Sequence, residues 1–319
     1  MLKNKKKFFL KTIIAIVTLI FVFFFDVSYT ERFKTRNSDG TQTLLTIKTS
    51  RKIFNPDGEY KISLNDESFY VYVSPGSKKK KNKKTLVILP EYTYFDYKNK
   101  ERKYVPHKDF EKLINELCWE YRIVVVEYYG YNKSDDTKRK RSAEEICFEI
   151  HTALHLLGIN KYILVPHGIS GLYAIKYIKK YPNEVKGMIG IDAIFPYYFL
   201  KIYDSNEDFL KRKVKNGVKK IPESYKNMQT YFWKTSKTLE KFKFTKEFPV
   251  ILFFSTQFIN EMDNLIKNKI LKVRFDDYFK SVLKNDNTQK MYVVTGNHYP
   301  NNSQYKAMYK LIKQNYLLF

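Results

Sequence analysis

Cysteine, glycine, proline and tryptophan are all scarce in this chain of 319 residues, which has 2 Cys, 11 Gly, 10 Pro and 2 Trp. Two cysteines exclude a disulfide-dense scaffold. Cys118 and Cys147 also lack metal-ligand spacing, and the sequence leaves open whether they are core thiols or a disulfide. The chain contains no internal repeats. Apolar residues make up 44% of it, enough for a core, which excludes wholesale disorder.

Acidic residues are also in short supply: 33 Asp and Glu stand against 58 Lys and Arg, a net charge of +25. Such an excess can indicate a nucleic acid or an anionic surface. No nucleic-acid motif or aromatic interleaving is present, so we expect no nucleic-acid partner. The lysine run at 78–84 is interpreted as a solvated loop, or as a contact with anionic lipid or wall polymer. Abundant Lys, Asn, Ile, Tyr and Phe also fit an A+T-rich coding bias, which weakens arguments from charge.

Only one hydrophobic run is long enough to span a membrane. Residues 8–25 are interrupted only by Lys11, and at ~1.5 Å per residue they cover roughly 27 Å of a hydrocarbon core of ~30 Å. Lysines precede the run, so the positive-inside rule keeps the N-terminus cytoplasmic. We expect 1–26 to be a basic flank and signal-anchor of a single-pass cell-membrane protein whose C-terminal domain is extracytoplasmic. The alternative, a cleaved signal peptide, needs small residues that 26–30 barely offers.

Residues 27–58 are polar and are expected to form an irregular stalk, followed by a globular domain over 59–319. Two strands with alternating polarity open the domain, and the later strands are apolar throughout, which is typical of a parallel sheet covered by helices. This pattern predicts an α/β fold with a mostly parallel sheet of about eight strands and helices on both faces. The predicted strands are 59–64, 68–73, 86–89, 123–126, 162–165, 188–191, 249–254 and 291–294. Residues 196–247 break the pattern and are predicted to be a helical lid insertion.

A strand, a sharp turn and a helix follow one another at 164–171, which reads Leu-Val-Pro-His-Gly-Ile-Ser-Gly. This is the architecture of a nucleophile elbow. The loop at 128–135, Tyr-Tyr-Gly-Tyr-Asn-Lys-Ser-Asp, adds a second motif after the preceding strand. With these motifs the chain resembles the α/β-hydrolase-fold superfamily, and more narrowly membrane-anchored α/β-hydrolase-like proteins of low-G+C Gram-positive bacteria. The resemblance covers about 59–319 and implies a hydrolase fold with a catalytic triad.

The elbow departs from the family pattern at its most important position. In the segments that relatives carry, P-H-S-x-S-G or G-H-S-x-G-G, the nucleophilic Ser follows the His, and here Gly168 follows His167. Glycine suits a strained turn because it tolerates positive φ, so the turn can survive without its chemistry. Ser170 is the fallback nucleophile, but that register moves the elbow two residues into the helix.

The resemblance implies roles for residues that follow other strands. His298 stands in the family's histidine loop and would be the base, and Asp192 ends an earlier strand, as the acid does in haloalkane dehalogenases. The oxyanion hole would use the backbone N–H groups of Ile169 and Tyr92. Relatives usually carry Gly where Glu91 stands, and a carboxylate beside the hole would repel a developing oxyanion.

No cofactor or metal is expected. His151 and His155 have helical spacing, but Thr152 stands where a zinc motif needs Glu. The favoured hypothesis is a membrane-anchored, degenerate or atypical hydrolase that binds a small apolar or acyl ligand. The second is an active carboxylic ester hydrolase that uses His298 and Asp192 with Ser170 or an activated water. The third is a surface protein that binds anionic wall polymer or lipid.

Overall fold

The computed structural model describes residues 27–36, 42–51, 58–64, 66–74, 83–91, 106–200, 223–268, 274–300 and 302–319. The expected signal-anchor at 1–26 and most of the lysine run lie outside these residues. Among the helices that are described, none is both long and apolar enough to cross a membrane. The chain divides into two compact units, one of residues 1–56 and 60–68, the other of residues 57–59 and 69–319.

The first unit contains antiparallel strands. β1(Val27–Arg36) pairs with β2(Gln42–Arg51), and β2 pairs in turn with β3(Gly58–Leu64). The stretch 27–58 is therefore not irregular throughout, which corrects the expectation of a featureless stalk. Thr occupies several positions in both strands, and this β-branched residue favours a pleated conformation even where the overall composition is polar.

The second unit is built on a mostly parallel sheet with the strand order β4-β6-β5-β7-β8-β9-β10. β4 is antiparallel to β6, and the other neighbours run parallel. The eight predicted strands correspond to β3 through β10, so the predicted sheet is confirmed. The strands of this unit are β4(Glu67–Val73), β5(Lys84–Leu89), β6(Tyr121–Val126), β7(Tyr162–Pro166), β8(Val185–Ile191), β9(Val250–Ser255) and β10(Gln289–Val294).

Helices follow most of the strands of this sheet. They are α2(Pro106–Asp109), α3(Glu111–Leu117), α4(Ala143–Leu156), α5(Ser170–Lys180), α7(Glu223–Leu239), α8(Thr256–Lys267), α9(Phe275–Val282) and α10(Asn302–Gln314), with a final 3₁₀ turn at η1(Tyr316–Leu318). α4 begins with a capping box, in which the Ser142 hydroxyl accepts from the Glu145 N–H and the Glu145 carboxylate accepts from the Ser142 N–H.

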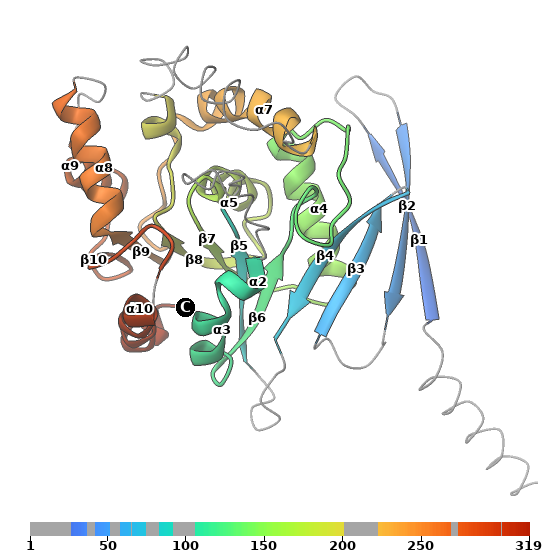
Figure 1. Ribbon diagram of the computed structural model, residues 1–319, viewed down its shortest axis with the longest axis horizontal. Helices are drawn as coiled ribbons and strands as arrows, with labels where there is room; N and C mark the ends of the chain where they lie inside the picture. The colour runs from blue at the N-terminus through green and yellow to red at the C-terminus, as the bar shows by residue number, and fades with distance from the viewer. Residues whose placement is uncertain are drawn as a thin grey trace, which may run out of the picture. The chain divides into compact units, whose positions relative to one another are not determined.

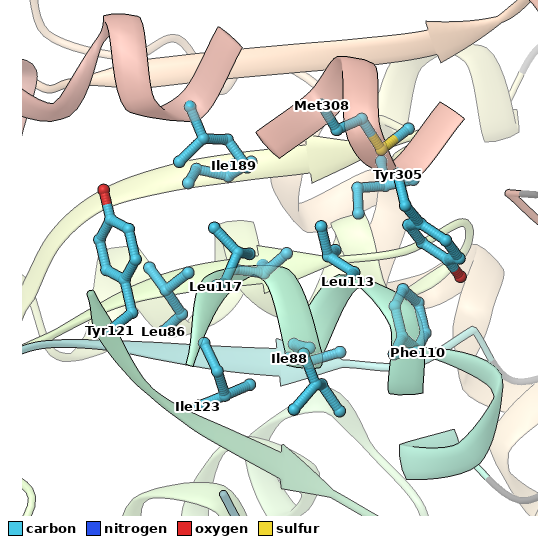
Figure 2. Close-up of a cluster of buried hydrophobic side chains, with 14 of the residues drawn as sticks. Leu86, Ile88, Phe110, Leu113, Leu117, Tyr121, Ile123, Ile189, Tyr305 and Met308 are labelled. Carbon is cyan, nitrogen blue, oxygen red and sulfur yellow. The ribbon is translucent and has the colours of Figure 1, made fainter. Parts of the chain in front are cut away.

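The two faces of the sheet carry different helices. Figure 1 shows α3 and α10 on one side of the sheet and α4 and α5 on the other. Alternate residues of β5 point to opposite faces, and Leu86 and Ile88 join α3 and α10 in a buried apolar cluster (Figure 2). Leu113 and Leu117 come from α3, and Met308 comes from α10. This packing fixes the carboxyl ends of the parallel strands at one edge, where ligands of open α/β sheets bind.

The described part of the predicted lid insertion is helical up to Leu239, and 240–247 form turns and irregular backbone. Residues 196–200 and α7 are helices, and 201–222 lie outside the described residues. Phe232 of α7 packs against Tyr173 of α5 with ring centroids 6.2 Å apart. Tyr198 lies over Phe279 of α9, with stacked rings 6.1 Å apart. These lid aromatics therefore serve packing between helices.

Candidate functional site at the carboxyl edge of the sheet

The turn between β7 and α5 has the geometry of a nucleophile elbow. Its tip, Gly168, has φ +53°, in the left-handed region that L side chains rarely adopt. The Gly168 N–H donates to Ile191 O (3.1 Å) and its carbonyl accepts from the Ile194 N–H (2.8 Å), which ties the turn to the end of β8. The structure thus places the strained turn where the sequence predicts it, with no side chain at the tip.

Glu91, which follows β5, fills the space that a side chain at position 168 would need. A Cβ atom built on Gly168 would lie 2.4 Å from Glu91 Cδ and 2.4 Å from Glu91 Oε1. Glu91 is 7% exposed. The sequence predicted this carboxylate beside the oxyanion hole and did not predict that it fills the space of a side chain at position 168. The available signal in the sequence was the combination of a long side chain, Glu91, after β5 with a glycine, Gly168, at the turn after β7.

His298 bridges two carboxylates. Its Nδ1 lies 3.0 Å from Asp192 Oδ2, and its Nε2 lies 2.5 Å from Glu91 Oε2. Asp192 is 1% exposed and is held at the end of β8 because it accepts from the N–H (2.6 Å) and hydroxyl (2.7 Å) of Ser255. The structure therefore brings together His298 and Asp192, the expected base and acid, and adds Glu91 on the other side of the ring.

Charge in this cluster follows from the contacts. Burial by itself would raise the pKa of Glu91, but the charge and hydrogen bond of His298 outweigh it and lower that pKa to about 2. Burial would lower the pKa of His298, but the Glu91 charge and hydrogen bonds to Asp192 and Glu91 raise it to about 10. At neutral pH the pair is a carboxylate and an imidazolium, and the ring has no lone pair with which to accept a proton.

His167, one residue before the elbow tip, is fully buried beside this pair. Its ring stacks on His298 with centroids 4.7 Å apart, and its Nε2–H donates to the His298 carbonyl at 3.0 Å. Burial, reinforced by the His298 charge, lowers its pKa. Tyr299 donates to Glu91. Glu91, His167 and His298 each offer one ligand atom, and these atoms lie within 4.8 Å of one another, so they are the described residues that could hold a metal ion.

Ser170 lies apart from this cluster. Its buried hydroxyl donates to Pro90 O (2.5 Å) and lies 3.0 Å from the Tyr128 hydroxyl. These contacts hold the first residue of α5 against the end of β5, and they engage the hydroxyl that the fallback register would use as nucleophile. Ile169 caps α5, at the place expected for one oxyanion donor, and Tyr92 lies outside the described residues.

A sizeable cavity lined by described residues reaches the site. It has a volume of about 260 Å³. Two exposed lysines, Lys108 and Lys112, contribute positive charge to its wall. An apolar pocket beside Phe258, under the lid, has about 10 Å³ and is thus filled by its own side chains. The residues that line the larger cavity are Lys108, Asp109, Phe110, Lys112, His167, Tyr299, Pro300 and Tyr305.

Two curated proteins match part of the sequence, and no family model matches the chain. The protein YbdG of Bacillus subtilis (strain 168) is 33% identical over 108 residues, 33% of this chain and 33% of YbdG. Epoxide hydrolase 1 of Caenorhabditis elegans is 34% identical over 101 residues, 31% of this chain and 25% of that enzyme. The chain thus spans a third or less of the length of these relatives.

Solved structures match over a longer range. The epoxide hydrolase CorEH, determined without ligand, superimposes with a TM-score of 0.55 at 11% identity, and the match covers 82% of this chain and 99% of that one. A structural match at such low identity supports a shared fold but not a shared activity, which depends on the residues of the site. Together with the strand order and the elbow, it shows that this chain has the α/β-hydrolase fold.

Proposed function

We propose that this chain is a membrane-tethered α/β-hydrolase-fold protein that binds a small acyl or apolar ligand and forms no acyl-enzyme. The observation that carries this proposal is the Glu91 carboxyl group in the space that a nucleophilic side chain at position 168 would fill. The proposal is a degenerate form of the hydrolase site, with the turn, the acid and the histidine retained.

Three features of the geometry argue against serine-type acyl transfer: they concern the nucleophile, the base and the oxyanion hole. Gly168 supplies no hydroxyl, and removing the nucleophile of a triad costs on the order of 10⁶ in rate. Both ring nitrogens of His298 are engaged by carboxylates, so neither is placed to take a proton from an attacking group. The Glu91 charge lies against the elbow, where it would repel an oxyanion that forms beside Ile169.

Ligand binding does not need those parts. The cavity of about 260 Å³ reaches His167 and Tyr299, next to the charged pair. Lys108 and Lys112 on its wall favour a ligand with an anionic end, such as a short-chain carboxylate. We therefore favour a small acyl ligand with a carboxylate group.

We also propose that the domain lies outside the cell and is held by the segment 8–25, with anionic lipid or wall polymer as a neighbour. The support for this is the hydrophobic run with its flanking lysines and the net charge of +25.

Active-site labelling tests the loss of acyl transfer. Gly168→Ser alone is a poor test because the new side chain would collide with Glu91. We therefore pair it with Glu91→Gly, which opens the space and frees His298 Nε2. We expect no fluorophosphonate labelling of the wild type. The double variant should be labelled at the hydroxyl introduced at position 168, and should hydrolyse p-nitrophenyl esters at least about tenfold faster than its control.

The matched control is Glu91→Gly with Gly168→Ala, which has the same opened space and no hydroxyl. Wild-type labelling or turnover that disappears in Ser170→Ala would overturn the proposal in favour of a serine hydrolase. Turnover that survives Ser170→Ala and disappears in His298→Gln would overturn it in favour of an activated water.

A further inference from the structure

The carboxyl edge of the sheet gathers three metal-ligating side chains from three separate segments. Glu91 follows β5, His167 follows β7 and His298 follows β10. One oxygen or nitrogen atom from each lies within 4.8 Å of the others. The strand order alone brings the first two segments together, because β5 and β7 are neighbours at the centre of the sheet.

Both imidazoles have an outer acceptor for one ring nitrogen. Asp192 accepts from His298 Nδ1, which leaves Nε2 directed at Glu91. The His298 carbonyl accepts from His167 Nε2–H, which leaves the lone pair of His167 on Nδ1. A carboxylate or carbonyl that fixes the tautomer in this way is the usual second layer around a metal-binding histidine.

One ring nitrogen of His167, Nδ1, takes no part in the hydrogen bonds described above. Nδ1 is fully shielded and has no hydrogen-bond partner among the described residues. A buried polar atom of this kind carries a desolvation cost unless something binds it. A metal ion is one group that an unprotonated imidazole nitrogen binds well. This observation is independent of the spacing of the three side chains.

The distances permit an ion after small side-chain movements, in which ligand atoms up to 4.8 Å apart approach one another and the closest pair separates. Bonds of about 2.0–2.1 Å to zinc place tetrahedral ligand atoms roughly 3.3 Å apart. His298 Nε2 and Glu91 Oε2, now 2.5 Å apart, would need to separate by less than about 1 Å to reach that spacing. Rotation about the Glu91 side-chain torsions supplies such a movement.

We propose that Glu91, His167 and His298 form a binding site for a divalent transition-metal ion of the Zn²⁺ class, which displaces to solvent the proton that His298 Nε2 shares with Glu91 when the site is empty. Two imidazoles and one carboxylate suit zinc and its neighbours rather than Ca²⁺ or Mg²⁺, which prefer all-oxygen sites. Three protein ligands leave a fourth position for water or for an anionic ligand. The site departs from the expectation that no metal binds. The metal site goes beyond the proposed function, because its three ligands could bind an ion whether or not the chain has lost acyl transfer.

Metal titration of the purified full chain in detergent tests this site. After treatment with a chelator, the protein is titrated with Co²⁺, whose visible d–d absorption reports nitrogen and oxygen ligation, and Zn²⁺ is then added in competition. We expect one tightly bound Co²⁺ per chain and its displacement by Zn²⁺. Glu91→Gln, which keeps the shape of the side chain, should weaken binding at least about tenfold, and His167→Ala should abolish the Co²⁺ spectrum.

The control is the double variant His151→Ala with His155→Ala. These rings stack on the surface of α4 with centroids 6.2 Å apart and could chelate an ion by themselves. Their removal should leave the spectrum unchanged. Circular dichroism of each variant checks the fold, and Glu91→Gln decides the matter if His167→Ala fails to fold.

A wild-type chain that gives no Co²⁺ spectrum would overturn the metal site, as would a spectrum that depends on His151 and His155 or that is untouched by Glu91→Gln. None of these results bears on acyl transfer. Fluorophosphonate labelling of the chelator-treated wild type would instead overturn the proposed function and leave the metal site standing.

Discussion

Gly168 and Glu91 form a complementary pair at the elbow. Position 168 needs glycine for two reasons: its φ is +53°, and a Cβ there would meet Glu91 at 2.4 Å. Glu91 in turn is buried only because His298 and Tyr299 satisfy its carboxylate. A buried carboxylate without such partners would cost several kcal/mol. Glycine at position 168 and the buried Glu91 carboxylate therefore depend on each other sterically.

The charged pair predicts how stability depends on pH in the metal-free protein. Since the pKa of His298 is raised to about 10, its charge stabilises the fold fully below about pH 6.5, and that contribution is lost as the pH rises toward 10. Glu91, whose pKa is lowered to about 2, loses its contribution as the pH falls from about 4 toward 2. Urea unfolding in a chelator should show that the free energy of unfolding falls by several kcal/mol more in the wild type than in His298→Gln between about pH 6.5 and 10.

His298→Gln serves as the comparison because it keeps a polar side chain of similar reach without a charge. Parallel pH curves for the two proteins would mean that the imidazole carries no raised pKa.

The elements position this pair through close packing of α5 on the end of β8. Gly171, in the first turn of α5, faces the backbone after β8: a Cβ there would lie 2.4 Å from Ile194 O and 3.0 Å from Ile194 N. The Gly168 carbonyl accepts from the Ile194 N–H in the same contact. The start of α5 and the loop after β8 thus form one rigid corner, from which Asp192 reaches His298.

Gly171→Ala tests the packing at this corner, because helix propensity and packing predict opposite changes in the free energy of unfolding. Propensity alone predicts a gain of about 1 kcal/mol when alanine replaces glycine within a helix. The clash with backbone atoms is stronger, so we expect a loss of at least ~1 kcal/mol in the free energy of unfolding. Urea denaturation measures it, with Lys179→Ala on the exposed part of α5 as the control. A more stable Gly171→Ala protein would show that α5 does not touch the loop.

The whole molecule combines the folded domain with a net charge of +25 and the segment 8–25. If that segment is an anchor, carbonate and high salt will leave the chain in the membrane fraction of an expressing bacterium. Protease added to cells stripped of their wall should digest the domain and remove its C-terminus. Immunoblotting of a tag on the C-terminus measures both the membrane fraction and the loss of the domain to protease.

A peripheral attachment or a cleaved signal peptide would place the chain in a different cell fraction. Release by high salt would mean a peripheral, electrostatic attachment. Recovery of a shortened chain in the medium would mean that the segment is cleaved as a signal peptide.

The sequence by itself determined the order of strands and helices, because apolar runs and helical spacing are local patterns. It also placed Gly168 at the elbow and singled out Asp192 and His298, which lie 3.0 Å apart through their side chains. It missed the strands within 27–58, where polar composition concealed β-forming residues. Only the tertiary structure decided where the Glu91 side chain lies and that His167 joins it. Those contacts depend on strand neighbours and on side-chain volume across the edge of the sheet, which no local pattern encodes.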